Sequence, residues 1–134
     1  MPINTAPNAP GAPEIILETT QADRIGAAAE AALRRFPELA GRLLDEIARA
    51  RVVPQGELPA DVVGLGKEIV YRDEVTGRET IVELVMPPEA DIDRNRVSVL
   101  TPIGVALIGL RAGASFTWET RNGETRRLTV TRVG

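Results

Sequence analysis

The spacing of apolar residues changes once along the chain, from a helical period to a period of two. Between residues 20 and 50, apolar side chains recur every three or four positions, which is typical of amphipathic helices. Two stripes follow this spacing: Ile25, Ala28, Ala29, Ala32, Leu33 and Phe36 form the first, and Leu39, Leu43, Leu44, Ile47 and Ala50 the second. From Lys67 onward the alternation is that of strands. The pattern therefore predicts two helices followed by a sheet.

Local signals predict where the two helices begin and end. Thr19 or Thr20 is expected to cap the first helix, with Asp23 in its first turn. This helix should stop at Phe36, because the residue before a proline avoids the helical region, and Pro37 can open the second helix. Two short adjacent helices with matching stripes predict an antiparallel helical hairpin, a short coiled coil.

The segment 97–113, VSVLTPIGVALIGLRAG, predicts a strand, a sharp corner and a short helix. Its apolar strand runs into Thr101, whose hydroxyl can cap free amides, and Pro102, which suits the first helical position. An apolar helix follows, and Gly113 breaks the pattern before the next strand. A corner of this kind tends to present one apolar side chain outward, so Thr101, Pro102 and Ile103 are a candidate docking point for a protein partner.

The other strands complete a small sheet. They are expected over residues 67–72 and 80–86 and, as a hairpin around Asn122-Gly123, over 115–120 and 125–133. With the strand before the corner, this gives an α+β fold whose second part is an antiparallel sheet of about five strands with one short helix.

Composition divides the chain into four parts. Residues 1–13 carry four prolines among small and polar residues and are expected to be a disordered tail. The short helical hairpin takes residues 14–52, of which the apolar start is expected to be an extended piece that docks elsewhere. A linker follows over 53–62, and the second domain covers 63–134.

Composition also argues against most catalytic chemistry. The chain has no histidine and no cysteine, so it lacks the commonest general base, disulfides and cysteine metal sites. A single lysine leaves the serines without an obvious base, so nucleophilic catalysis is not expected. Glu89, Asp91 and Asp93 alternate in one loop, but Arg94 and Arg96 follow at once, which favours a solvated loop over a cation site. We therefore expect a binding protein without metal or cofactor.

The charge and the apolar runs restrict partner and location. A net charge of −3 argues against strong direct binding of nucleic acid, which needs a basic surface. The start of the chain lacks the pattern of a signal peptide, and no segment approaches 18 apolar residues. The sequence therefore predicts a cytoplasmic protein without a membrane partner.

The segment 97–113 resembles the signature of the C-terminal domain of bacterial Gre-type transcript cleavage factors. The matching positions are Ser98, Thr101-Pro102, Ala106-Leu107, Gly109 and Gly113, whereas Ala114 departs from the usual aspartate. Within this superfamily, the chain from about Glu14 onward resembles the Rnk family, the regulators of nucleoside diphosphate kinase. That resemblance is carried by the short hairpin, the linker LPADVV and the strands KEIVYRD and SFTWE.

The resemblance implies an FKBP-like C-terminal domain that binds bacterial RNA polymerase at the rim of its secondary channel, in competition with Gre-like factors. Thr101, Pro102 and Ile103 would be the apolar anchors there, with Asp93 and Arg94 as a polar rim. A prolyl isomerase is another FKBP-like possibility, but its pocket is lined by several aromatic rings and this domain has only three aromatic residues. A scaffold that binds another protein through the hairpin is the alternative function.

The predicted tip of the hairpin differs from that of Gre factors, where a long coiled coil carries two acids that help to hold a catalytic magnesium. Here the hairpin is roughly 20 Å long at 1.5 Å per residue. Its tip residues Arg34, Arg35, Phe36 and Glu38 include one acid beside two arginines, which would repel Mg²⁺. The expected function is therefore that of a non-catalytic polymerase-binding regulator that does not stimulate transcript cleavage.

Overall fold

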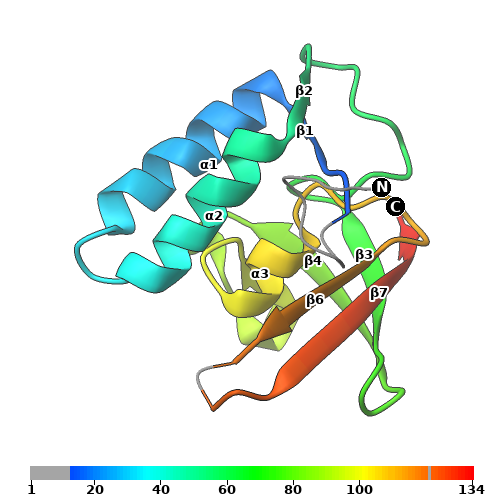
Figure 1. The fold of residues 1–134 in the computed structure, drawn as a ribbon. Helices are drawn as coiled ribbons and strands as arrows, with labels where there is room; N and C mark the ends of the chain where they lie inside the picture. The colour runs from blue at the N-terminus through cyan, green and yellow to red at the C-terminus, as the bar shows by residue number, and fades with distance from the viewer. Residues whose placement is uncertain (1–12, 121) are drawn as a thin grey trace, which may run out of the picture.

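The computed structural model describes residues 13–120 and 122–134, so all of the expected disordered tail except Pro13 lies outside the described residues. Over the described residues the chain has the predicted α+β fold, with three α-helices and a curled five-stranded sheet (Figure 1). The helices are α1 (Thr19–Ala32), α2 (Pro37–Arg49) and α3 (Pro102–Leu107), with two 3₁₀ turns, η2 (Pro87–Glu89) and η3 (Ile92–Arg94). The strands are β1 (Ile16–Glu18), β2 (Arg51–Val53), β3 (Glu68–Asp73), β4 (Glu79–Val85), β5 (Arg96–Ser98), β6 (Ser115–Glu119) and β7 (Thr125–Val133).

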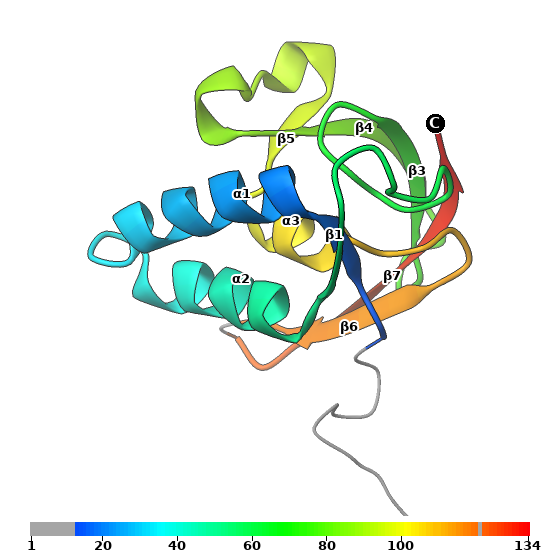
Figure 2. The same cartoon turned by 90° about the horizontal axis from the view of Figure 1, so that it is seen from above.

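Helices α1 and α2 lie side by side and run in opposite directions (Figures 1 and 2). Their buried residues come from the predicted stripes, among them Ile25 and Leu43. The expected cap of α1 is wrong: the N-cap is Glu18, and its side chain makes no capping hydrogen bond. The hydroxyl of Thr19 instead donates to the carbonyl oxygen of Val53 at 2.9 Å, which ties the start of α1 to β2. The first turn of α1 contains no acid, so the expected place of Asp23 is also wrong.

Helix α1 ends earlier than predicted. Its last residue is Ala32, whose carbonyl oxygen accepts hydrogen bonds from the amides of Arg35 and Phe36. The chain therefore turns before Pro37, and Phe36 is half-exposed rather than part of the buried stripe. Pro37 opens α2 at the first helical position, as predicted.

A two-stranded parallel sheet joins the bases of the two helices, because β1 precedes α1 and β2 follows α2. The apolar start of the chain docks as expected: Ile15 and Leu17 are each only 1% exposed. The amide of Ile16 donates to the carbonyl oxygen of Gly109 at 3.0 Å. Gly109 has φ +78°, and a Cβ there would lie 2.8 Å from the Cβ of Ile15, so this close approach requires glycine.

The five-stranded sheet has the order β5-β4-β3-β7-β6. The pairs β3–β4, β3–β7 and β6–β7 are antiparallel as predicted, but β5 is parallel to β4, with Glu83 opposite Arg96 and Val85 opposite Ser98. The expectation of a wholly antiparallel sheet is therefore wrong. After β4, the turns η2 and η3 carry the chain back to the middle of that strand, so β5 enters the sheet in the same direction.

Helix α3 is shorter than the apolar pattern suggests. It ends at Leu107, and Ile108 already leaves the helical region, with ψ 129°. The glycine with positive φ that follows is Gly109, so the helical pattern breaks four residues before Gly113. Gly113 also has positive φ and leads into β6 as predicted.

One hydrophobic core connects the helices to the sheet. Its fully buried members come from α1, α2, α3, β1 and three sheet strands: Ile25, Leu43, Leu107, Leu17, Ile69, Leu84 and Leu128. Helix α3 lies between α2 and the sheet, with contacts to β5 and β6 as well as α2. Within the described ranges, no helix has the length and apolar character needed to cross a membrane.

Candidate docking site

The corner at the start of α3 is built as the sequence predicts. The Oγ1 of Thr101 accepts a hydrogen bond from the amide of Gly104 at 2.9 Å and donates one to the carbonyl oxygen of Ser98 at 2.7 Å. Pro102 occupies the first helical position. The hydroxyl thus fixes the first turn of α3 to the end of β5, which makes the corner rigid.

The corner presents part of its apolar surface to solvent. Pro102 is exposed and Ile103 is half-buried, whereas the residues from Gly104 to Leu110 are all buried. The buried residues anchor α3 in the core. Pro102 and Ile103 are therefore held in place by residues that take no part in the exposed surface.

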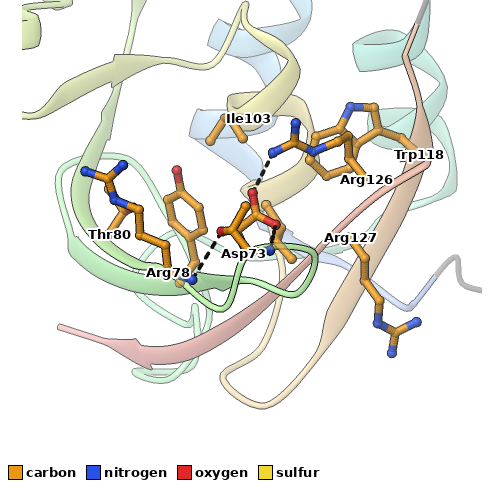
Figure 3. A pocket seen from close by; sticks show the side chains of 10 residues that line it. Asp73, Arg78, Thr80, Ile103, Trp118, Arg126 and Arg127 are labelled. Carbon is orange, nitrogen blue, oxygen red and sulfur yellow. Dashed lines mark hydrogen bonds and ion pairs between the residues drawn. The ribbon is translucent and has the colours of Figure 1, made fainter. Parts of the chain in front are cut away.

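Ile103 also lines a cavity of about 120 Å³ between the start of α3 and strands β3, β4, β6 and β7 (Figure 3). Its apolar walls are Tyr71, Ile103, Trp118 and Leu128. Its polar and charged lining residues are Asp73, Thr76, Arg78, Thr80, Arg126 and Arg127, of which Arg127 points away from the cavity in Figure 3.

A hydrogen-bonded ion pair lies at the cavity between the carboxylate of Asp73 and the guanidinium of Arg126. Burial is the largest single influence on the pKa of Asp73 and raises it. Hydrogen bonds from the amides of Val75 and Thr76 and from Arg126 together outweigh burial, so the pKa of Asp73 lies below its ordinary value. Among the described residues, Arg78 has no carboxylate partner, which leaves its charge unpaired beside the cavity.

The other predicted polymerase contacts, Asp93 and Arg94, belong to a different element. They lie on η3, which contacts β5, and they are not among the residues that line the cavity. The carboxylate of Asp91 accepts a hydrogen bond from the amide of Asp93 at 3.1 Å and pairs with Arg94 at 3.8 Å. The turn is thus held by its own hydrogen bonds beside β5, apart from the cavity at the corner.

The predicted tip residues lie together where the chain passes from α1 to α2. Arg34, Arg35, Phe36 and Glu38 are all exposed, and the guanidinium of Arg35 lies 5.6 Å from the ring centre of Phe36. Glu38 occupies the first turn of α2. The tip is thus a basic and aromatic surface with one acid.

The sequence pattern does not single out the cavity residues Tyr71, Asp73, Trp118 and Arg126 as a site. They come from three strands, and only the pairing of β6 with β7 places Trp118 opposite Arg126. The hairpin signal at Asn122-Gly123 was the one available clue to that register. In the part of the chain that the structure describes, no group of acidic side chains has the arrangement of a metal site.

Comparison with known proteins assigns the fold and its corner to a family. Residues 58–134, more than half of the chain, match the model of the family described as "Transcription elongation factor, GreA/GreB, C-term". The chain belongs to the GreA/GreB family. The matched region of this Gre-family protein contains the corner, the cavity and all five strands of the larger sheet.

Individual relatives extend the likeness to the helices. This Gre-family protein is 32% identical over 118 residues to the "Regulator of nucleoside diphosphate kinase" of Escherichia coli (strain K12), which covers 88% of this chain and 87% of that protein. A solved structure titled "Prokaryotic transcription elongation factor GreA/GreB from Nitrosomonas europaea" has a TM-score of 0.70 and 31% identity, over 90% of this chain and 98% of that one. The predicted resemblance to the Gre superfamily and to Rnk is therefore confirmed.

The likeness to GreA itself is partial. The "Transcription elongation factor GreA" of Rhodopseudomonas palustris (strain BisA53) is 37% identical over 73 residues. That match covers 54% of this chain and only 46% of GreA. This match therefore gives no information about the part of GreA that lies outside it.

Proposed function

We propose that this protein is a non-catalytic transcription regulator that binds bacterial RNA polymerase near the rim of its secondary channel and acts in the cytoplasm. The observation that carries the proposal is the rigid, capped corner, which exposes Pro102 and Ile103 beside a cavity within the region that matches the Gre family. Apolar side chains held in place before binding lose little conformational entropy when a partner covers them. They are therefore suited to be the centre of a protein interface.

In this proposal residues 63–134 form an FKBP-like docking domain, and residues 14–52 form a short coiled-coil hairpin joined to it by the linker 53–62. Asp93 and Arg94 on η3 would make a second, polar contact at the edge of the interface. Gre-like factors would compete with this protein for the polymerase, because they would dock through the corresponding corner.

The first prediction is that Pro102→Ala and Ile103→Asp weaken binding to core RNA polymerase, by roughly threefold and at least tenfold, respectively. Both changes remove apolar surface from the centre of the proposed interface, and the second adds a charge that must be desolvated. Equilibrium binding of labelled protein to the core enzyme, with GreA as competitor, measures the effect. Pro88→Ala is the matched control, because it removes an exposed proline from η2 and should leave the affinity unchanged.

Unchanged affinity for both variants, with circular dichroism showing that they are folded, would move the polymerase contact away from the corner. The exposed side chains of Leu33 and Phe36 favour one alternative, a scaffold that binds another protein through α1 and α2. In that case Phe36→Ala, and not Pro102→Ala, would weaken capture of the partner.

The second prediction is that the protein leaves the cleavage of backtracked transcripts at the rate of polymerase alone. The 14 residues of α1 span about 21 Å at 1.5 Å per residue, and the tip places two guanidinium groups beside one carboxylate. A cationic tip repels the magnesium ion that a cleavage factor must help to hold. Single-round cleavage of a stalled complex measures this, with GreA as the positive control. Cleavage above the polymerase-alone rate would refute the non-catalytic assignment.

A further inference from the structure

The turn η3 carries one apolar side chain that is almost fully exposed to solvent. Ile92 is 91% exposed, more than any other large hydrophobic residue among those described. A single exposed apolar side chain is common on protein surfaces and means little by itself. Ile92 differs because the backbone around it is tightly fixed.

Hydrogen bonds close the turn on both sides of Ile92. The carbonyl oxygen of Asp91 accepts hydrogen bonds from the amides of Arg94 at 3.1 Å and Arg96 at 2.9 Å. The amide of Asp91 in turn donates to the carbonyl oxygen of Arg96 at 3.0 Å. Asn95 takes φ +57°, and its carbonyl oxygen accepts a hydrogen bond from the amide of Glu83 on β4 at 2.8 Å. Ile92 is thus presented from a preformed turn, which lowers the entropy cost of burying it in a partner.

Acidic residues flank Ile92 in the sequence. Glu89 and Asp93 are exposed and make no ion pair with any described residue, and Arg94 is occupied by Asp91. We call this element the knob: Ile92 with the flanking carboxylates of Glu89 and Asp93. Its partner must offer a small apolar recess with positive charge beside it.

The cavity beside the corner has these properties. Its volume of about 120 Å³ suits a branched aliphatic side chain, since a cavity of about 150 Å³ accommodates benzene. Tyr71, Ile103 and Trp118 supply apolar walls, and Arg78, which has no ion-pair partner among the described residues, supplies positive charge. The knob lies beside the edge strand β5, and none of its residues is among those that line the cavity of its own chain.

We propose that two copies of this chain associate by placing the knob of one copy in the cavity of the other. Ile92 would be buried against Ile103 and Trp118, and Glu89 and Asp93 would face Arg78. Because knob and cavity are different surfaces, the contact either closes as a reciprocal dimer or continues head to tail. Self-association does not depend on the proposed polymerase binding. If both hold, association covers the corner at Ile103 and so keeps the protein from polymerase.

Sedimentation equilibrium over a range of protein concentrations tests the proposal. The wild type should associate, and Ile92→Asp should weaken association by at least about tenfold, the effect expected from losing one buried aliphatic side chain. Val52→Asp is the matched control, because Val52 is an exposed apolar residue on β2, away from knob and cavity, and should associate as the wild type does. A wild type that stays monomeric at millimolar concentration, or an Ile92→Asp variant that associates normally, would overturn the proposal.

Mixing two variants tests the pairing itself. Arg78→Glu impairs the cavity at an exposed residue without an ion pair and leaves the knob intact, whereas Ile92→Asp leaves the cavity intact. Each variant alone should be largely monomeric, and an equimolar mixture should form one-to-one pairs. Failure of the mixture to pair would refute the assigned contact. Polymerase affinity measured on dilute wild-type protein, below the concentration at which it associates, separates this proposal from the proposed function, because the monomer should bind polymerase whether or not self-association occurs.

Discussion

Gly104→Ala is expected to lower the free energy of unfolding by about 3 kcal/mol or more, the upper part of the range for overpacked cores. A Cβ on Gly104 would lie 2.2 Å from the carbonyl oxygen of Ser98 and 2.7 Å from the Cα of Val99. Both neighbours are backbone atoms at the end of β5, so no side chain can move aside to relieve the contact. Urea unfolding followed by Trp118 fluorescence measures the loss.

Gly41→Ala is the control for that result. Gly41 lies inside α2, and a Cβ there would meet nothing within 4 Å. Alanine should therefore stabilise the protein by about 0.5–1 kcal/mol, because it favours the helix over the unfolded chain. Equal behaviour of the two variants would mean that α3 does not lie directly on the end of β5.

Leu43→Ala is expected to destabilise the protein by about 3 kcal/mol, within the range measured for leucine truncation in cores. Leu43 on α2 is fully buried in the core that α1, α3 and the sheet share. Helices and sheet should therefore unfold together, with far-ultraviolet circular dichroism and Trp118 fluorescence giving one midpoint. Leu33→Ala is the control: that side chain is 37% exposed, so its loss should cost less than about 1 kcal/mol. Loss of helix at lower urea than the fluorescence change would show that the two parts do not share their stability.

The sequence predicted those features whose causes lie within a few residues. The cap at Thr101 and the proline at 102 act on the next turn of chain, and both are placed as expected. The hydroxyl of Thr19 failed as a cap because its acceptor, the carbonyl oxygen of Val53, comes from a strand 34 residues away. The direction of β5 failed for a related reason: alternation of side chains is the same in parallel and antiparallel strands, and the path of the chain after β4 decides between them.

The candidate site likewise has a part that depends on neighbouring residues, which the sequence predicts, and a part that depends on distant ones, which it does not. Pro102 and Ile103 could be predicted, because a strand followed by a capped helix fixes a local corner. The cavity could not, because its walls come from α3 and from strands whose register is set by the whole sheet. The family resemblance groups Asp93 and Arg94 with the corner, whereas in the structure they lie on a separate turn beside β5.

The parallel pair β1–β2 has a mechanical consequence for the two N-terminal helices. It holds the start of α1 and the end of α2 together. The hydrogen bond from the amide of Ile16 to the carbonyl oxygen of Gly109 fixes this end of the helix pair beside the residues that follow α3. The two helices therefore keep a fixed orientation relative to the sheet and do not move as a hinged unit. A partner that binds the corner at Pro102 therefore also determines the positions of Arg34 and Arg35 relative to itself. Each helical turn added to or removed from both α1 and α2 would displace these two charges by about 5.4 Å.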